Sequence, residues 1–397
     1  MNNGRRGTNP TLDSPILPGA TIGILGGGQL GRMSAMAAKR MGYRVVVLTP
    51  EVNSPCAQVC DQDLVAPYDD PQALETLLQQ AQVVTYEFEN VPAQAVARLE
   101  SQGLAFPSSR ILEICQHRLK EKQALRELGI PTADFAAVRS LADLEAAAAR
   151  LGYPCVLKTV SGGYDGKGQY VIRSADDLAP AYAALSPLAR ELILEAFVSF
   201  ERELSIIVAR NRRGECATFP LAENLHVQNI LHRTLAPAPV SEAKAQEAAQ
   251  LGRRIAEGMD LVGLISVELF DTPGGLLVNE LAPRPHNSGH FTLEACVTSQ
   301  FEQHIRAVCG LPLGSTAQWQ PAVMLNILGQ HLPGLLANLE KVLRAGDVKV
   351  HLYGKSEARH HRKMGHVTIL APTPQAALER AEAVWRLITG DRGQPSL

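Results

Sequence analysis

The stretch SVELFDTPGGLLVNELAPRPHNSGH, residues 266–290, decides how the rest of the chain is interpreted. It predicts two short apolar strands, Ile265–Phe270 and Leu276–Leu281, joined by a turn rich in proline and glycine. Glu268 and Glu280 lie twelve residues apart across this turn, so we expect them to share one face of the hairpin. Two carboxylates on one face repel each other unless a cation lies between them.

Mg²⁺ fits this position, because it binds proteins through one or two carboxylates and completes its shell with substrate phosphates. A surface hairpin with two solvated glutamates explains the pair equally well from this stretch alone. Strict alternation turns Asn279 to the opposite face, so a metal role for its side chain requires a β-bulge or a strand end there. The rest of the chain has to decide between the two interpretations.

The composition bounds the class of protein. With 397 residues, 46% of them hydrophobic, the chain is long enough for two or three domains with large cores. Its 38 basic and 40 acidic residues nearly balance and only 5% are aromatic, which argues against a nucleic-acid partner. Seven cysteines, of which only Cys56 and Cys60 are closely spaced, argue against a disulfide framework or structural zinc and favour the cytoplasm.

The first residues and the longest apolar runs add two expectations. Residues 1–19 predict a loose polar tail and no signal peptide, because they contain no apolar core segment. The chain has no run of about 18 apolar residues, so we expect no membrane partner.

Alternating apolar strands and helices predict a doubly wound parallel sheet over residues 20–115. The first strand runs into Gly26-x-Gly28-x-x-Gly31, the spacing of a dinucleotide fingerprint at the start of a helix. Dinucleotide binding, binding of another phosphate such as a ribose 5-phosphate, and a tight turn without a ligand all remain open. Thr49 stands where an acidic ribose ligand is expected, which disfavours NAD.

Further residues are candidates for contacts with a ligand. Glu87 and Glu89 follow an expected strand, at the sheet edge where ligands bind, although a solvated strand exit is the commoner explanation of either one alone. Lys158 ends an apolar strand, so an anion should lie near its ammonium unless the side chain reaches solvent. The loop Gly162–Gly168 contains four glycines and precedes a strand, which favours a flexible lid over phosphates; a long hairpin is the alternative.

The region 320–390 predicts a small C-terminal unit that carries a basic cluster. Within twelve positions the chain has Lys355, Arg359, His360, His361, Arg362, Lys363 and His366. Such a cluster suits a phosphate or a carboxylate, although a solvated basic turn is the commoner explanation of a charge run.

A lysine in an apolar strand, a glycine lid, a strand glutamate and a two-glutamate hairpin occur in this order. Together they describe a nucleotide between two β layers with Mg²⁺ on its phosphates. The chain thus resembles the ATP-grasp superfamily and, within it, the N5-carboxyaminoimidazole ribonucleotide synthetase family. The matching segments, within residues 20–388, are Gly28–Met33, Tyr86–Val91, Gly162–Gln169, Asn279–Arg284, His286–His290, Tyr353–Lys355 and Arg362–His366.

The resemblance implies an α/β fold that is α+β in part. It divides the chain into a doubly wound pre-ATP-grasp domain at 20–115, an ATP-grasp domain at 116–310 with a lid at about 130–198, and a β-rich domain at 320–390. The implied activity is that of an ATP-dependent carboxylase of purine biosynthesis. It would convert 5-aminoimidazole ribonucleotide and bicarbonate to the N5-carboxy product through carboxyphosphate, releasing ADP and phosphate.

ATP is then the co-substrate, with two Mg²⁺ ions expected and Mn²⁺ as an alternative, and the expected state is a cytoplasmic homodimer with small-molecule partners. By resemblance, Glu268 and Glu280 would bind metal, while Lys158, Asp165 and Arg284 would act in catalysis. ATP would be held by Arg118, Lys158, Gly163, Tyr164, Asp165, Gly166, Lys167, Gly168, Gln169, Glu195, Ala196, Phe197, Val198, Glu203, His226, Asn279 and Glu280. The ribonucleotide would be held by Gln29, Glu87, Tyr164, Asp165, Asn287, Lys355 and Arg362. His360-His361 replaces the Pro-Gly expected in this family, which leaves the path of that turn open.

Three other functions compete with this interpretation. A formate-using glycinamide ribonucleotide transformylase shares the metal hairpin but uses another acceptor. A synapsin-like module would bind the nucleotide without turnover. A nicotinamide-dependent oxidoreductase would use Gly26–Gly31 and would leave the lid and the paired glutamates unexplained.

Overall fold

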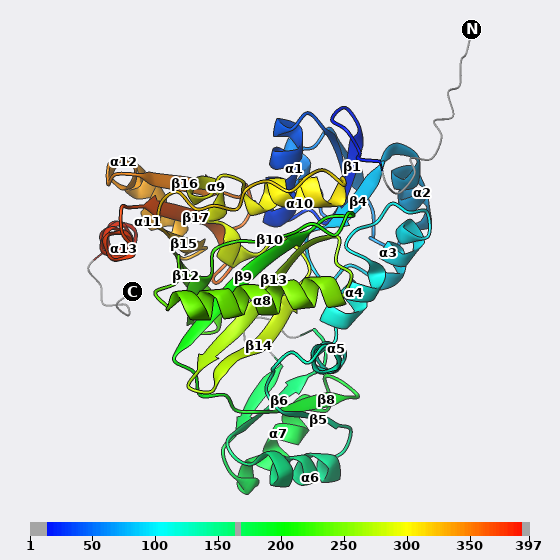
Figure 1. Ribbon diagram of the computed structural model, residues 1–397, viewed down its shortest axis with the longest axis vertical. Helices are drawn as coiled ribbons and strands as arrows, with labels where there is room; N and C mark the ends of the chain where they lie inside the picture. The colour runs from blue at the N-terminus through cyan, green and yellow to red at the C-terminus, as the bar shows by residue number, and fades with distance from the viewer. Residues whose placement is uncertain (1–13, 163–167, 391–397) are drawn as a thin grey trace.

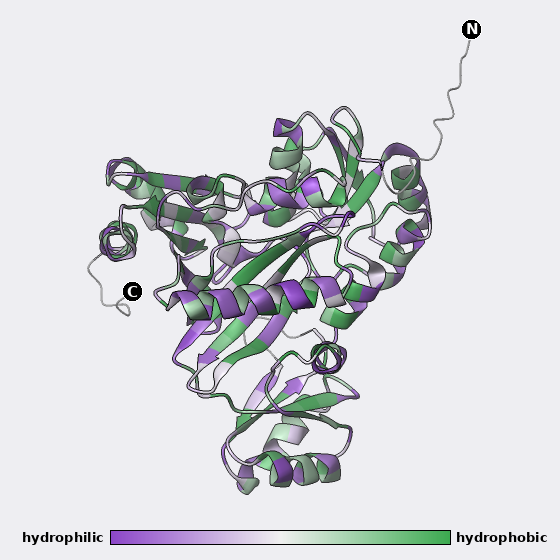
Figure 2. Ribbon diagram, in the orientation of Figure 1, coloured by the Kyte–Doolittle hydropathy of each residue, from purple (hydrophilic) through white to green (hydrophobic). Residues whose placement is uncertain are grey.

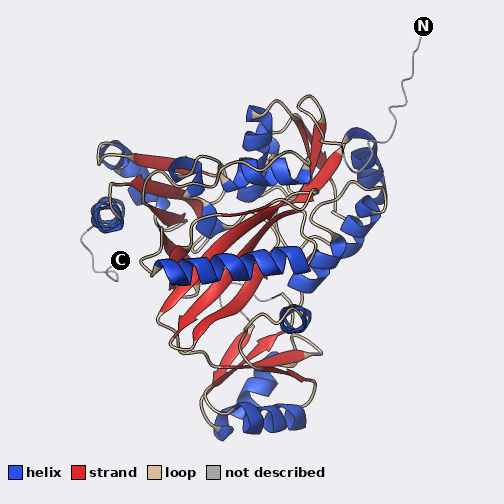
Figure 3. Ribbon diagram, in the orientation of Figure 1, coloured by secondary structure: helices blue, strands red, loops and turns tan. Residues whose placement is uncertain are grey.

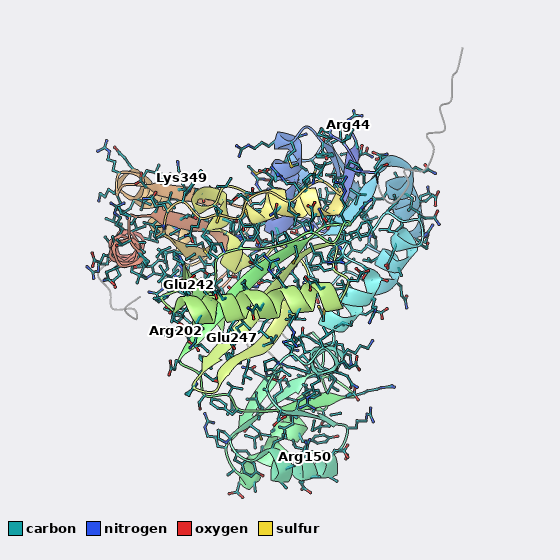
Figure 4. All side chains as sticks on the ribbon, in the orientation of Figure 1. Arg44, Arg150, Arg202, Glu242, Glu247 and Lys349 are labelled. Carbon is teal, nitrogen blue, oxygen red and sulfur yellow. The ribbon has the colours of Figure 1, made fainter. Side chains whose placement is uncertain are left out.

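The computed structural model describes residues 14–162 and 168–390. Its ribbon has three regions (Figures 1 and 3): a long central sheet crossed by α8, an N-terminal sheet at one end, and a small sheet with its own helices below. The labelled charged side chains Arg44, Arg150 and Lys349 project from the outside of the N-terminal, lower and C-terminal parts (Figure 4).

The N-terminal sheet is parallel and doubly wound, as predicted. In the described part of the chain its strand order is β3-β2-β1-β4. The elements are β1 (Thr21–Leu25), α1 (Gln29–Arg40), β2 (Arg44–Thr49), η1 (Ala57–Val59), β3 (Gln62–Val65), α2 (Pro71–Gln80), β4 (Val83–Tyr86) and α3 (Ala93–Glu100). Helices α2 and α3 bury apolar side chains against one face, and α1 with α10 covers the other. Both faces of the sheet are therefore covered, as a parallel sheet requires.

The small sheet forms the lid region, with antiparallel order β5-β8-β6-β7. Its elements are β5 (Phe135–Val138), α6 (Leu141–Leu151), β6 (Cys155–Thr159), β7 (Gln169–Ile172), η2 (Ala175–Asp177), α7 (Leu178–Leu185) and β8 (Leu192–Ala196). Leu144, Ala148 and Ala181 from the two helices pack on its inner face, so the lid has a core of its own.

The central sheet is antiparallel and contains nine strands within the described residues. Its order is β14-β13-β9-β11-β12-β15-β17-β16, with β10 paired to β9. The strands are β9 (Arg202–Arg210), β10 (Cys216–Thr218), β11 (Ala222–Val227), β12 (Ile230–Ala236), β13 (Gly263–Thr272), β14 (Gly275–Ala282), β15 (Ala322–Leu328), β16 (Val348–Leu352) and β17 (Lys363–Leu370). Because β12 pairs with β15, the strands of the C-terminal region continue the same sheet.

Helix α8 (Glu242–Gly258) lies across one face of this sheet, where its apolar side covers hydrophobic strands (Figure 2). Leu251 and Ile255 pack against Ile206 and Val267, so this face is a closed core. The remaining helices are α4 (Ser109–Cys115), α5 (Arg118–Glu127), η3 (Asn287–Gly289), α9 (Thr292–Ala295), α10 (Gln300–Val308), α11 (Leu332–Ala337), α12 (Leu339–Leu343) and α13 (Pro374–Thr389). No described helix has both the length and the apolar character needed to cross a bilayer.

Residues 14–19 correct part of the expected tail. Ile16 is buried, and its backbone N–H bonds to the carbonyl of Cys309 while its own carbonyl accepts the hydroxyl of Tyr43. Ile16 lies in the apolar stretch Pro15-Ile16-Leu17-Pro18 and buries its side chain, so the chain is anchored from here onward. The thiols of Cys56 and Cys60 lie 3.5 Å apart without a disulfide.

Candidate active site

Glu268 and Glu280 are direct partners across the β13–β14 hairpin. From the turn, residues pair in strict succession as far as Leu269 and Val278, and the register then shifts before Glu268. Asn279 is therefore the extra residue of a β-bulge, the feature that a metal role for its side chain requires. In an unshifted register Asn279, and not Glu280, would lie opposite Glu268.

The bulge also decides which face Glu280 occupies. Leu276 and Val278 are buried in the core beneath α8, and strict alternation would place Glu280 on that same face. The extra residue changes the phase, so Leu281 returns to the core and Glu280 opens into the cavity on the other face. Glu268 and Glu280 share one face of the hairpin, as predicted. The bulge places them there, because the spacing across the turn alone would put Asn279 opposite Glu268.

A cavity of about 400 Å³ lies between the central sheet, the lid and the end of the N-terminal sheet. It is lined by Glu89, Asn90, Cys115, Gln116, Arg118, Glu121, Lys158, Gly162, Gln169, Glu195, Glu203, His226, Asn229, Leu231, Glu268, Asn279, Glu280, Arg284, His286, Asn287 and Lys363. Its wall is strongly polar, with cations and carboxylates from separate regions of the chain, and its size suits a nucleotide-sized ligand.

The carboxylates of Glu268 and Glu280 repel each other, and a bound cation would relieve this repulsion. Burial, followed by the charge of Glu280, raises the pKa of Glu268 to about 7, and His226 opposes this. His286 Nε2 lies 3.4 Å from the Glu268 carboxylate, but burial and nearby Arg284 hold the pKa of His286 well below its ordinary value. The neighbouring imidazole is thus neutral near pH 7 and does not balance the two carboxylates.

The described residues contain no group of three or more His, Cys, Asp or Glu side chains able to hold a metal by themselves. Mg²⁺ does not require such a group, because one or two carboxylates suffice when phosphate oxygens complete its shell. The facing pair Glu268 and Glu280, with Asn279 between them on β14, fits Mg²⁺ bound to a phosphate ligand.

Lys158 has the anionic partner that its sequence context predicts. Its ammonium lies 2.9 Å from Glu195 Oε2, and both side chains are largely buried. Burial alone would raise the pKa of Glu195, but Lys122 and Lys158 outweigh it and lower the pKa. Glu195 Oε1 is buried without a hydrogen-bond partner among the described residues, so one acceptor remains for a ligand. Arg118 lies nearby and donates to the carbonyl of Thr159 at 3.0 Å.

Two further pairs line the same cavity. Arg284 contacts Glu89 at 2.5 Å, and Glu203 contacts Nδ1 of His226 at 2.8 Å. Burial opposes the charged form of His226, but its hydrogen bond to Glu203 and the carboxylate charge outweigh this and raise its pKa. The amide nitrogen of Asn287 is buried and has no acceptor in the described part of the chain, so it is available to a ligand.

The glycine turn before α1 binds an anion from the protein itself. The Glu87 carboxylate accepts the backbone N–H of Gly31 at 2.6 Å and also that of Gly28. A Cβ on Gly28 would lie 2.6 Å from a Glu87 oxygen, so the absence of a side chain at this position lets the carboxylate come this close to the backbone. Burial raises the pKa of Glu87, opposed by these two N–H groups and then by Lys355 and Arg284. A dinucleotide phosphate at this turn would have to displace an internal carboxylate.

The basic cluster divides into buried and solvated members. Lys355 lies near Glu87, and burial, followed by the charge of Arg362, lowers the pKa of Lys355 to about 8. Arg362 contacts Glu51 at 3.7 Å, whereas Arg359 pairs with a neighbouring glutamate at the surface. The segment is tied to the N-terminal region, because Gln58 donates to the carbonyl of Gly354 at 2.9 Å.

Of the predicted site residues that the structure describes, eleven line one cavity and eight do not. Its wall contains Arg118, Lys158, Gln169, Glu195, Glu203, His226, Glu268, Asn279, Glu280, Arg284 and Asn287. Outside the wall lie Gln29, Glu87, Gly168, Ala196, Phe197, Val198, Lys355 and Arg362, with Gln29 and Glu87 at the glycine turn and Ala196–Val198 at the end of β8. The predictions for Gly163, Tyr164, Asp165, Gly166 and Lys167 fall outside the described residues.

Several lining residues carry no role in the sequence-based prediction, among them Glu121, Gln116, Asn90 and His286. Glu121 stands beside a lysine on an ordinary charged helix, and nothing in the sequence distinguishes it from a solvated glutamate. Lys363 belongs to the basic cluster that the sequence analysis identified. The sequence does not show which side chains of that cluster face the cavity and which face solvent.

Comparison with known proteins agrees with this geometry. Family models match residues 19–116 as a ribonucleotide synthetase preATP-grasp domain, 123–301 as an ATP-grasp domain, and 322–380 as a phosphoribosylaminoimidazole carboxylase C-terminal domain. N5-carboxyaminoimidazole ribonucleotide synthase of Bacillus subtilis (strain 168) is 45% identical over 380 residues, covering 96% of this chain and 98% of that protein.

Solved structures give the same result. An ADP complex of N5-carboxyaminoimidazole ribonucleotide synthetase has a TM-score of 0.89 at 50% identity, covering 94% of this chain and 99% of that chain. An Aspergillus clavatus synthase in complex with ADP and 5-aminoimidazole ribonucleotide has a TM-score of 0.86 at 33% identity, covering 95% and 99%. The fold and the site thus define an ATP-grasp protein. Within that class, the chain belongs to the N5-carboxyaminoimidazole ribonucleotide synthase family.

Proposed function

We propose that this chain carboxylates the amine of 5-aminoimidazole ribonucleotide with ATP and bicarbonate, as its family name implies. The observation that carries the proposal is one cavity in which the facing Glu268 and Glu280 lie beside the Lys158–Glu195 pair and the Arg284–Glu89 pair. These are the groups needed to hold a nucleoside triphosphate, a divalent cation and a small anion in contact.

ATP would lie between the lid and the central sheet. Arg118 and Lys158 would contact its phosphates, while Glu195 and the backbone through Val198 would hold adenine. Glu203, oriented by His226, would accept the ribose hydroxyls. The loop Gly163–Lys167 and Gln169 would close over the phosphates, and exclusion of water would protect the labile carboxyphosphate anhydride.

Glu268, Glu280 and Asn279 would hold Mg²⁺, with two ions as the expected number and Mn²⁺ as a substitute. The metal would neutralise charge on the transferred phosphoryl group. Bicarbonate would attack the γ-phosphorus of ATP, forming one P–O bond and breaking the bond to ADP. Arg284 would hold the bicarbonate and then the carboxyphosphate, which requires its guanidinium to share or leave Glu89.

The ribonucleotide would lie toward the glycine turn and the basic cluster. Lys355 and Arg362 would bind its phosphate, and Gln29, Glu87 and Asn287 would contact the remainder. Carboxyphosphate would deliver CO₂ to the exocyclic amine, forming the new C–N bond and releasing phosphate. Tyr164 and Asp165 of the lid would meet this amine, with Asp165 as hydrogen-bond acceptor or base.

The decisive experiment is an ADP-release assay with bicarbonate, with and without 5-aminoimidazole ribonucleotide. Stimulation by the ribonucleotide supports the proposal. Stimulation only by formate with glycinamide ribonucleotide would support the transformylase, and nucleotide binding without any ADP release would support a binding module. No observation on this chain favours either alternative.

We also propose a cytoplasmic homodimer. The seven cysteines are free thiols, which suits a reducing compartment. Val297 and Trp319 are 57% and 66% exposed, and backbone bonds join the segments that carry them, so a second copy would cover these two apolar side chains. Sedimentation of the wild type and Trp319→Ser tests this; a monomeric wild type would refute it.

A further inference from the structure

Two consecutive charged residues of α5, Glu121 and Lys122, are fully buried against the outer side of β14. The Lys122 ammonium donates to the backbone carbonyls of Asn279 at 2.7 Å and Val278 at 3.2 Å, and to Thr132 Oγ1 at 2.9 Å. Glu121 Oε2 accepts the backbone N–H of Leu281 at 3.1 Å. The two side chains thus bind the backbone on both sides of Glu280.

This arrangement matters because β14 is the edge strand of the central sheet. Among the described strands, β13 alone pairs with it, so its outer backbone groups need other partners. Pro131 accepts the N–H of Val278 at 2.8 Å, and the Thr132 hydroxyl donates to the Val278 carbonyl at 2.9 Å. Lys122 and Glu121 complete this set where the ladder is broken at Asn279.

The turn provides no reason for the bulge, because pairing proceeds regularly from the turn to Leu269 and Val278. A bulge leaves one residue without ladder bonds, and it persists where other groups satisfy that residue. Here those groups come from α5, more than 150 residues earlier in the chain.

We propose that Lys122 and Glu121 are positioning residues that hold the Asn279 bulge and thereby keep Glu280 opposite Glu268. Loss of their contacts favours the unshifted register, in which Asn279 faces Glu268 and Glu280 turns toward the core beneath α8. This inference rests on the proposed role of Glu280 as a ligand for the metal on the nucleotide.

The contacts indicate that Lys122 acts through the backbone and not on the ligand. An ammonium has three N–H donors, and three oxygens of the described residues accept from Lys122, which leaves no donor for a phosphate. Glu121 lines the cavity, and its Oε2 accepts the N–H of Leu281. It could therefore act through this hydrogen bond or through its negative charge on the ligand, and the test has to distinguish the two.

The test is calorimetric binding of ADP to the full chain, once with Mg²⁺ and once with EDTA. In Lys122→Met the Kd for ADP with Mg²⁺ rises about tenfold or more, while the Kd with EDTA stays within about twofold of wild type. Lys120→Met, an exposed lysine two residues away on the same helix, leaves both values unchanged. Thr132→Val removes only the shared hydroxyl and raises the Kd with Mg²⁺ by about two- to fivefold, which keeps the test usable if Lys122→Met does not fold.

Glu121 is tested by a pair of variants. Glu121→Gln keeps an acceptor for the Leu281 N–H and leaves the Kd with Mg²⁺ within about threefold, whereas Glu121→Leu removes the acceptor and raises that Kd about tenfold. Equal damage by both variants would overturn the positioning role of Glu121 in favour of a role for its charge.

Two outcomes would overturn the role of Lys122. One is an unchanged Mg²⁺-dependent gain in ADP affinity in Lys122→Met and Thr132→Val. The other is an equal loss of affinity with and without Mg²⁺, which indicates general destabilisation. If Mg²⁺ does not strengthen ADP binding in the wild type, the proposed metal role itself fails. The wild type alone gives this result, so it can be told apart from a failure of the positioning role, which only the variants reveal.

Discussion

The Glu87 carboxylate occupies the position at the start of α1 where a dinucleotide phosphate would lie, 2.6 Å from the backbone nitrogen of Gly31. The turn Gly26–Gly31 therefore has an anionic partner within the chain, at a helix N-terminus that favours negative charge. Of the three possibilities that the glycine spacing left open, a tight turn without a bound dinucleotide agrees best with this contact. The turn packs around Glu87, and Glu87 in turn lies near Lys355 of the C-terminal region.

Removing this carboxylate should weaken the fold as well as substrate binding. Glu87→Ala leaves the N–H groups of Gly28 and Gly31 without an acceptor, which lowers the free energy of unfolding by about 1–3 kcal/mol. Urea unfolding measures this change, and the KM for 5-aminoimidazole ribonucleotide should rise in the same variant. Glu75→Ala, at a solvated ion pair on α2, should change stability by less than about 1 kcal/mol. Unaltered stability of Glu87→Ala would contradict the capping role.

The oxidoreductase alternative makes an opposite prediction for the same turn. With Glu87 in place, NAD should not bind at millimolar concentration, because its pyrophosphate would meet a buried carboxylate. Titration of NAD followed by calorimetry tests this directly. Saturable NAD binding would show that Glu87 yields its place to a ligand.

Glu280→Gln should abolish ADP formation. The substitution keeps the size of the side chain but removes the charge that faces Glu268, and we expect a loss of roughly 10²–10³-fold or more in kcat. Glu247→Gln, at an exposed position on α8 (Figure 4), is the matched control and should behave as the wild type. Near-normal turnover of Glu280→Gln would refute the metal assignment.

The Lys158–Glu195 pair should show strong coupling in a double-mutant cycle. Lys158→Met removes the cation that lies 2.9 Å from the buried Glu195 carboxylate. We therefore expect the free energy of unfolding to fall by about 1–3 kcal/mol and the KM for ATP to rise. Adding Glu195→Gln should restore much of the stability but not the activity. If the two changes in stability are simply additive, the pair does not interact as the 2.9 Å contact indicates.

Activity should fall on the alkaline side because of Lys355. Burial and Arg362 lower the pKa of Lys355 to about 8, so the ammonium that would bind substrate phosphate is present below that pH and is lost above it. We expect kcat/KM for the ribonucleotide to decrease as the pH rises through about 8. Lys355→Arg should move this decrease to higher pH, and an identical profile in that variant would exclude Lys355 as its source.

The same pKa has an opposite effect on stability. An unfolded lysine keeps its proton up to about pH 10.5, so between pH 8 and 10.5 the unfolded state binds more protons than the native state. The contribution of Lys355 to the free energy of unfolding therefore increases over this range. Comparing unfolding of the wild type with Lys355→Met across pH isolates this contribution, and an alkaline loss attributable to Lys355 would contradict the lowered pKa.

The sequence by itself determined the architecture and most of the cavity wall. The alternation of apolar strands and helices predicted the doubly wound sheet. This architecture buries the apolar faces of both, because the helices cover the two faces of the sheet. The lysine in an apolar strand predicted a nearby anion, and Glu195 is that anion, because a buried ammonium needs a partner. These inferences held because they depend on local pattern and on the free energy of burying charge.

The tertiary structure alone decided the register at the metal pair and the partner of the glycine turn. Counting residues across the turn does not place Glu280 opposite Glu268; the bulge at Asn279 does, and its backbone is bound by Lys122 and Glu121. Likewise, nothing in the spacing of the glycines reveals that Glu87 fills their turn. Hydrogen bonds between segments far apart in the chain set both features, and local periodicity carries no information about such contacts.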